Sequence, residues 1–233
     1  MRGQACVLYG AAEFSRDTDL AVLANSANLE KLRRVMDDLR AEVIAVPPFE
    51  AKYLRRGHAV HFRCQHPEAA GMRIDVMTKM RGVEPFSKLW SRRSSISVEE
   101  GSACEVLSLP DLVRAKKTQR DKDWPMIRRL VEVHYFENRD RPTRQQVSFW
   151  FLELRTPELL IELAAAHRDL PRHLLVRRPL LRLAQSGRKT ALRNALLQEE
   201  ALEREADRRY WAPLRAELEK LRHKRAGDHP SRL

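Results

Sequence analysis

Three aspartates are the residues of this sequence with the clearest capacity for chemistry. Asp17 and Asp19 are separated by one residue, and Asp75 stands between Ile74 and Val76. Alternate side chains of a β-strand lie on the same face, so Asp17 and Asp19 would lie side by side in a strand. Two neighbouring carboxylates repel each other unless a cation or a shared proton lies between them. The spacing therefore indicates a cation site.

Mg²⁺ is the cation that suits such a site, because it prefers oxygen ligands and binds one or two carboxylates together with substrate phosphates. Asp75 is flanked by apolar residues and would be costly to bury without a partner. A position on a strand beside the first two aspartates would provide that partner. The alternative is structural: Asp17 caps a turn and Asp75 lies on an exposed sheet face. An isolated Asp-x-Asp more often has that structural role.

The residues around the aspartates follow an order that resembles a known family. The order is Arg2-Gly3-Gln4-Ala5, then Leu8-Tyr9-Gly10, then Ser15-Arg16-Asp17-Thr18-Asp19-Leu20. It is similar to the nucleotidyltransferase superfamily, which has the DNA-polymerase-β-like fold, and above all to its small bacterial abortive-infection and toxin–antitoxin members. Those proteins carry a Gly-Gly-x-Ala turn, a short helix ending near Tyr-Gly, and Arg-x-Thr-x-Asp-x-Asp before an apolar strand.

The resemblance extends to about residue 135. Asp75 matches the third carboxylate of the family by position and strand context. A later segment resembles the helical Leu-x-x-Leu…Lys…Arg-x-Lys-Asp pattern that follows the catalytic sheet; it comprises Leu109-Pro110-Asp111-Leu112, Lys116, Arg120 and Asp123. There are departures: Arg2 replaces the first glycine and Ser15 replaces a usual Thr. The strand before the turn has no counterpart, so we expect a start assigned too late or an abbreviated member.

The resemblance implies a two-metal nucleotidyl transfer from an NTP such as ATP to a hydroxyl of RNA, for example tRNA, or of a protein. Asp17 and Asp19 would hold two Mg²⁺ (or Mn²⁺) ions, and Asp75 would complete the shell of one. A toxin-type enzyme would also have a cognate antitoxin as a partner. The residues implied to bind the nucleotide are Gly3, Gln4, Ser15, Arg16, Lys116, Arg120 and Asp123.

Two of these assignments have structural alternatives. Lys116, Arg120 and Asp123 have the spacing i, i+4 and i+7, which predicts one helix face. That face could contact nucleotide phosphates or form a solvated ion-pair ladder. Arg16 could touch the triphosphate or be a plain surface cation. A second hypothesis for the whole chain is a non-catalytic module that binds nucleic acid or a partner protein on a degenerate form of the same fold.

The elements that must position these residues indicate an α+β protein. Residues 1–108 are predicted to form a nucleotidyltransferase-like mixed sheet with helices, and residues 109–233 a mainly helical region. Apolar spacing predicts a helix over 28–40. Strands are predicted over 42–46, 59–65 and 73–78, with weaker strand signals over 94–107 around Gly101. After Pro110, helices are predicted over 111–119 and 124–135, followed by helical stripes at 149–154, 157–167, 180–184 and 208–221.

Composition narrows the class of protein. The formal net charge of +12 favours polyanionic partners such as RNA, although basic proteins need not bind nucleic acid. Three scattered cysteines indicate reduced thiols rather than a disulfide framework. The sequence has no apolar run of about 18 residues, so no membrane span is predicted. The start lacks the features of a signal peptide, so we expect a cytoplasmic protein.

Two further segments have a chemical and a structural interpretation. His58, His61, Cys64 and His66 lie close together and invite zinc, but no second Cys/His pair follows at finger spacing, so Cys64 is predicted to be a small core residue. Residues 170–198 contain basic residues and no acidic residue. That segment would either bind an RNA backbone or form a solvated helix face.

Overall fold

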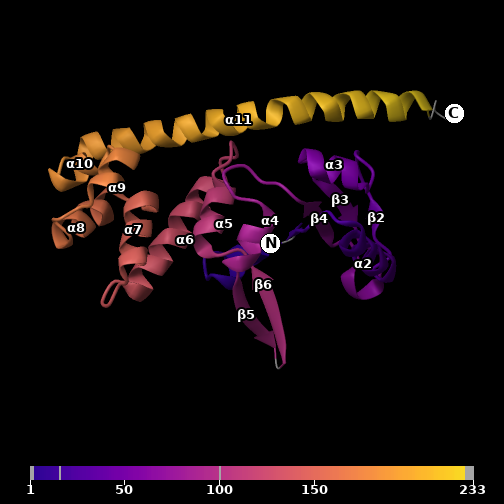
Figure 1. The fold of residues 1–233 in the computed structure, drawn as a ribbon, viewed down its shortest axis with the longest axis horizontal. Helices are drawn as coiled ribbons and strands as arrows, with labels where there is room; N and C mark the ends of the chain where they lie inside the picture. The colour runs from indigo at the N-terminus through magenta and orange to yellow at the C-terminus, as the bar shows by residue number, and fades with distance from the viewer. Residues whose placement is uncertain (1–2, 16, 100, 229–233) are drawn as a thin grey trace. The chain divides into compact units, whose positions relative to one another are not determined.

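Two compact units make up the chain. The computed structural model describes residues 3–15, 17–99 and 101–228 (Figure 1). One unit comprises Met1–Ala115 with Arg208–Leu233, and the other comprises Lys116–Asp207. The α+β class is confirmed, with a small mixed sheet in the N-terminal part and a helical C-terminal part. The sequence placed its division at residues 108 and 109; the compact units divide a few residues later, and the last part of the chain belongs to the first unit.

A four-stranded mixed sheet is the centre of the first unit. The strand order is β1-β4-β3-β2, with β1 parallel to β4 and the other neighbours antiparallel. The elements before the hairpin are α1 (Gly3–Leu8), β1 (Asp17–Ala21), α2 (Ser26–Asp38), β2 (Glu42–Val43), α3 (Ala51–Arg56), β3 (Val60–Arg63), a 3-10 turn (Pro67–Ala69) and β4 (Arg73–Met77).

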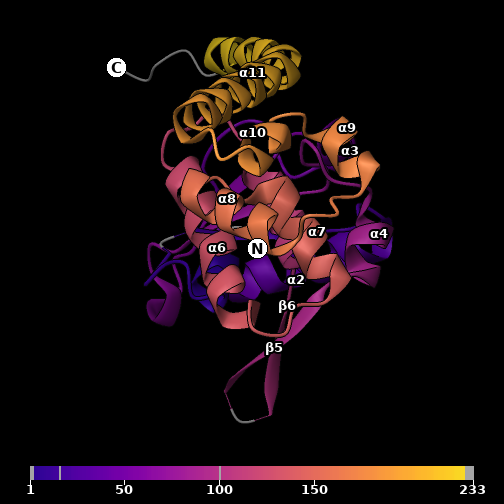
Figure 2. The same cartoon turned by 90° about the vertical axis from the view of Figure 1, so that its left-hand side faces the viewer.

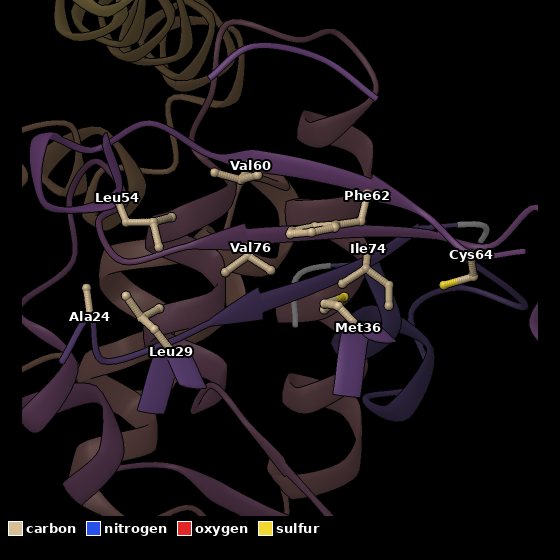
Figure 3. Close-up of a cluster of buried hydrophobic side chains, with 9 residues drawn as sticks. All are labelled: Ala24, Leu29, Met36, Leu54, Val60, Phe62, Cys64, Ile74 and Val76. Carbon is tan, nitrogen blue, oxygen red and sulfur yellow. The ribbon is translucent and has the colours of Figure 1, made fainter. Parts of the chain in front are cut away.

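The hydrophobic core of this unit lies on one face of the sheet. Helix α2 begins at the Asn25 cap, whose side chain accepts a hydrogen bond from the Asn28 N–H at 2.8 Å. Side chains of α2 pack against alternate residues of β3 and β4, and Leu54 of α3 joins them (Figure 3). The core cluster comprises Ala24, Leu29, Met36, Leu54, Val60, Phe62, Cys64, Ile74 and Val76. Because strand side chains alternate, the intervening residues of β1, β3 and β4 lie on the opposite face.

Strand β2 is shorter than predicted, since the ladder includes only Glu42 and Val43 of the expected 42–46. Pro47 and Pro48 follow and have no N–H to donate to a ladder. The strand signals after residue 93 are confirmed as a hairpin, β5 (Ser94–Glu99) and β6 (Ser102–Val106), which extends as a two-stranded ribbon in both views (Figures 1 and 2). The Tyr9 hydroxyl donates to the Leu107 carbonyl at 2.8 Å and ties α1 to the base of this hairpin.

The remaining elements are helices. Helix α4 (Phe86–Ser91) precedes the hairpin, and the helices that follow it are α5 (Leu109–Lys116), α6 (Asp123–Asn138), α7 (Arg144–Glu153), α8 (Pro157–Ala166), α9 (Arg172–Arg177), α10 (Leu181–Gln185) and α11 (Lys189–Asp228). Helix α5 ends at Lys116, three residues before the predicted end of 111–119. Helix α11 belongs to the helical unit up to Asp207 and to the sheet unit from Arg208. Within the described residues, no helix has an apolar stretch long enough to span a membrane.

Candidate functional site

The face of the sheet opposite the core carries the three predicted carboxylates. In the parallel pair of β1 and β4, Asp19 is the direct neighbour of Asp75, and Asp17 is the neighbour of Arg73. In the antiparallel pair of β3 and β4, His61 is the neighbour of Asp75 on its other side. Residues paired in register point to the same face, so Asp19, Asp75 and His61 form one row across three strands. Asp17 and Arg73 belong to the next row.

The side chain of Asp75 is only 13% exposed. The Arg73 guanidinium holds both of its oxygens, with Nε at 2.8 Å from Oδ1 and Nη2 at 3.2 Å from Oδ2. His61 Nδ1 lies 2.8 Å from Oδ1 of Asp75 and 3.1 Å from Nη2 of Arg73, and the tautomer of His61 decides whether this nitrogen donates to the carboxylate or accepts from the guanidinium. Burial alone would raise the pKa of Asp75, but the hydrogen bonds from His61 and Arg73 outweigh it and lower the pKa below its usual range.

Arg73 also responds to the other two carboxylates. Its hydrogen bond to Asp75 raises the pKa of the guanidinium, burial opposes the rise, and the charges of Asp17 and Asp19 add to it. Arg73 is therefore close enough to all three aspartates to feel their charge. The predicted site thus includes a built-in cation that sequence reasoning missed. A period-2 pattern could have found it, because Arg73 lies two residues before Asp75 on the same strand face.

The start of β1 is held by two of the predicted nucleotide-binding residues. The Gln4 side-chain amide donates to the Ser15 carbonyl at 3.0 Å, and the Ser15 hydroxyl donates to the Asp17 carbonyl at 2.9 Å. Both side chains thus fix the backbone that presents Asp17. Helix α1 begins at Gly3, as the resemblance implies, but it is only six residues long. Arg16, the remaining predicted residue of this segment, lies outside the described residues.

Lys116, Arg120 and Asp123 do not share one helix face, so that prediction is wrong. Helix α5 ends at Lys116, Arg120 lies in the connection, and Asp123 begins α6. The connection nevertheless brings them together: Asp123 lies 3.3 Å from Lys116 Nζ and 2.9 Å from Arg120 Nε. All three belong to the helical unit, whereas the aspartates of β1 and β4 belong to the sheet unit.

Asp123 is 2% exposed, and Thr118 also donates to its carboxylate. Burial would raise the pKa of Asp123, but Lys116, Thr118 and Arg120 together lower it below its usual range. A carboxylate at the first turn of α6 is also stabilised by the positive end of the helix dipole. These contacts fix the connection that leads into α6, and the nucleotide-binding role of the three residues stays a prediction.

The structure bears on metal binding in two ways. The donor set on the sheet face consists of carboxylate oxygens, the ligands that Mg²⁺ and Mn²⁺ prefer. Among the residues that the structure describes, however, no three His, Cys, Asp or Glu side chains converge closely enough to hold a metal ion. Asp75 is instead held by Arg73 and His61. The chemistry of the donors fits such an ion, and the arrangement would have to tighten around it.

The histidines considered for zinc are dispersed. His58 is 2% exposed and lies 2.9 Å from Glu217 of α11, while His61 binds Asp75. His66 accepts a hydrogen bond from the Glu68 N–H. Cys64 is 1% exposed in the hydrophobic core, as predicted. Each residue of this group therefore has a separate structural partner.

Only part of the basic segment 170–198 is engaged in ion pairs that fix its side chains. Arg178 is 4% exposed, donates to the Phe151 carbonyl at 2.8 Å and pairs with Glu199. Lys189 pairs with Glu158 at 2.7 Å. The other basic side chains of the segment are exposed; they are Arg172, Arg177, Arg182, Arg188 and Arg193. This surface is accessible to an anionic partner, and RNA binding remains a prediction.

No family model matches the sequence, and no curated protein matches it. The geometry of the sheet face and the chemistry of its side chains are therefore the basis for a functional proposal.

Proposed function

We propose that this protein is a cytoplasmic nucleotidyltransferase. It would transfer a nucleoside monophosphate from an NTP to a hydroxyl of RNA, such as a tRNA end, or of a protein. The observation that carries the proposal is the parallel register of β1 and β4, which makes Asp19 and Asp75 direct neighbours and puts Asp17 on the same face. The Asp-x-Asp spacing and the position of Asp75 in the sequence agree with this use of the face.

Asp17, Asp19 and Asp75 are the residues that would hold Mg²⁺ or Mn²⁺, which when bound would neutralise charge on the triphosphate and lower the pKa of the acceptor hydroxyl. Arg73 and His61 keep the carboxylate of Asp75 ionised and fix its orientation. Gln4 and Ser15 hold the first residue of β1 in place. The side chains of this face thus form an anionic surface on adjacent strands, and they would have to draw closer together around the ion.

The further residues assigned to the nucleotide are part of the same proposal. Gly3, at the start of α1, allows a close backbone approach to phosphate. Lys116, Arg120 and Asp123 belong to the helical unit, and their part in nucleotide binding stays a prediction; the side chain of Arg120 is 50% exposed. A toxin-type enzyme of this kind would also be expected to bind a cognate antitoxin.

The second candidate function is a non-catalytic module that binds nucleic acid or a partner protein. It is favoured by the bidentate contact of Arg73 with Asp75, which satisfies that carboxylate without any metal. The net charge of +12 would attract a polyanion in either case.

A transfer assay on the full chain separates the two functions. The protein is incubated with each α-labelled NTP, Mg²⁺ or Mn²⁺, and total tRNA, and label is followed on both RNA and protein. Asp19→Asn is the test variant. Glu30→Gln is its matched control, because Glu30 is an exposed acidic residue on α2 that pairs only locally with Arg34.

The proposal expects label transfer that falls by at least about a hundredfold in Asp19→Asn and persists in Glu30→Gln, because the carboxylate acts on charge that develops during transfer. Label transfer that persists at the native level in Asp19→Asn would contradict the assignment of the active site to this face. If no NTP is bound or transferred while RNA still binds, the non-catalytic function replaces the enzyme.

A further inference from the structure

A cavity of ≈ 510 Å³ lies within the helical unit and is independent of the carboxylate face. It is bounded by the start of α6, the connection between α7 and α8, and the first half of α11. Its walls combine apolar residues such as Pro125, Pro157 and Leu196 with the guanidinium groups of Arg155, Arg193 and Arg204. The volume falls in the range of small-molecule sites, which hold ligands of nucleotide size.

Arg155 is the unusual member of this lining. Its side chain is only 6% exposed, and its Cζ lies over the Trp124 ring at 4.6 Å from the centroid. Nη2 donates to the Leu196 carbonyl at 3.0 Å. Nη1 has no hydrogen-bond partner among the described residues, and the carboxylate oxygen paired with it, Oε1 of Glu199, is 3.7 Å away. Nη1 has almost no accessible surface, and buried donors are almost always satisfied, so a guanidinium N–H without an acceptor in a residue that lines a cavity points to a ligand.

The acidic residues of the lining do not supply the missing acceptor. Glu158 is paired with Lys189 at 2.7 Å, and Glu200 with Arg204 at 2.7 Å. Arg204 also holds Asp121. The lining carries four guanidinium groups, of Arg128, Arg155, Arg193 and Arg204, against the three carboxylates of Asp121, Glu158 and Glu200, so its formal net charge is positive.

Arg193 supplies the second cation. It lines the same cavity one helical turn before Leu196, whose carbonyl accepts from Arg155. Its side chain is exposed, whereas that of Arg155 is buried. One guanidinium is therefore fixed at the wall, and the other can close over a bound group from the solvent side.

We propose that this cavity binds the phosphate group of a nucleotide-sized ligand. A phosphate presents several acceptor oxygens, and guanidinium groups bind it by charge-assisted, often bidentate hydrogen bonds. Arg155 Nη1 would donate one of these bonds, Arg193 would donate others, and the organic part of the ligand would rest on Pro125, Pro157 and Leu196. Phosphate binding at this site would need no divalent metal, so it is tested independently of the transferase proposal.

A free nucleotide and the 5′-phosphate of an RNA end present the same group. Calorimetry on the full chain without divalent metal distinguishes them, with inorganic phosphate, AMP, adenosine, and a short RNA with or without a 5′-phosphate as the probes. The proposal expects AMP to bind at least about tenfold more tightly than adenosine, since the phosphate contributes the charged contacts. Tighter binding of the 5′-phosphorylated RNA than of AMP would identify the RNA end as the source.

Arg193→Ala is the test variant, because an exposed residue can be replaced without disturbing the fold. Its control is Arg172→Ala, an exposed arginine of α9 that does not line the cavity. We expect the Kd for AMP to rise about tenfold in Arg193→Ala and to stay unchanged in Arg172→Ala. Arg155→Lys, which keeps the charge and removes the planar fork, should weaken binding further, with its fold checked by circular dichroism.

Three results would overturn the proposal: equal affinity for AMP and adenosine, equal effects of Arg193→Ala and Arg172→Ala, or no binding of any phosphate-bearing probe to the native chain.

Discussion

Two groups of residues in this molecule combine carboxylates with basic side chains and differ in how completely the charges are matched. On the sheet face, Asp17, Asp19 and Asp75 share their surroundings with Arg73 and His61. At the junction of α5 and α6, one carboxylate, Asp123, is shared by Lys116, Thr118 and Arg120. Carboxylates are in excess in the first group, and cations are in excess in the second.

Burial explains what each group can do. Asp123 is 2% exposed and surrounded by donors, so its charge is used to fix the start of α6 to the residues that precede it. All residues of β1 are only partly buried, and Asp17 and Asp19 therefore remain within reach of solvent. An anionic face with some access to water can exchange its partners for a cation or a substrate, whereas a buried and satisfied carboxylate cannot do so without unfolding its surroundings.

The largest effect that tests this contrast is on activity. Asp75→Asn should reduce label transfer by at least about a hundredfold, because the row formed with Asp19 loses a charge that acts during transfer. The thermal unfolding midpoint should change little, since Arg73 is 40% exposed and can be solvated. Transfer assays and melting curves on the same preparation measure both. An unchanged rate would show that the sheet face is as structural as the helix junction.

The second effect is on stability. Asp123→Ala leaves Lys116, whose side chain is 9% exposed, buried without its carboxylate. Removal of one partner of a buried ion pair should lower the free energy of unfolding by about 3 to 5 kcal/mol. Denaturant unfolding followed by circular dichroism measures this, with Asp169→Ala as the control because Asp169 is exposed. Equal midpoints for the two variants would refute the structural role of the junction.

Low pH should weaken the contacts that Asp123 makes with Lys116, Thr118 and Arg120. The pKa of Asp123 in the folded chain is below the ordinary value of 3.8, so its contribution to stability is complete above that pH. The contribution is lost as the pH falls below 3.8 and through the lower folded value. The difference in melting temperature between the native chain and Asp123→Asn should therefore narrow across this range. A difference that stays constant with pH would contradict the ionised state assigned to Asp123.

The smallest effect concerns Ser15. Its hydroxyl donates to the Asp17 carbonyl, so Ser15→Ala should cost about 1 kcal/mol of stability. If that bond is its main role, the KM for the NTP should stay within about twofold of the native value. A large rise in KM at unchanged stability would instead support the triphosphate contact implied by the family resemblance. Steady-state kinetics together with thermal unfolding separates these outcomes.

The spacing of apolar residues predicted the main strands and helices well where either the strand period of two or the helix period of 3.6 residues was clear. The strand patterns around Phe62 and Ile74 predicted β3 and β4, and the apolar spacing over 28–40 predicted α2. Helix α5 was predicted to end at residue 119 and ends at Lys116, and the helical spacing of Lys116, Arg120 and Asp123 wrongly predicted one helix face. In the structure Lys116, Arg120 and Asp123 contact one another across the connection between α5 and α6, and not along one helix face.

The sequence alone determined that the Asp-x-Asp pair, the residues proposed to carry the chemistry, lies on one strand face, because side chains alternate at every residue. It also determined that Cys64 belongs to the core, since its neighbours at period two are apolar. Only the tertiary structure decided that β1 lies parallel to β4 in a register that puts Asp19 beside Asp75, and that Arg73 and His61 hold Asp75. Strand register and long-range charge pairing depend on how distant segments pack, which no local period encodes.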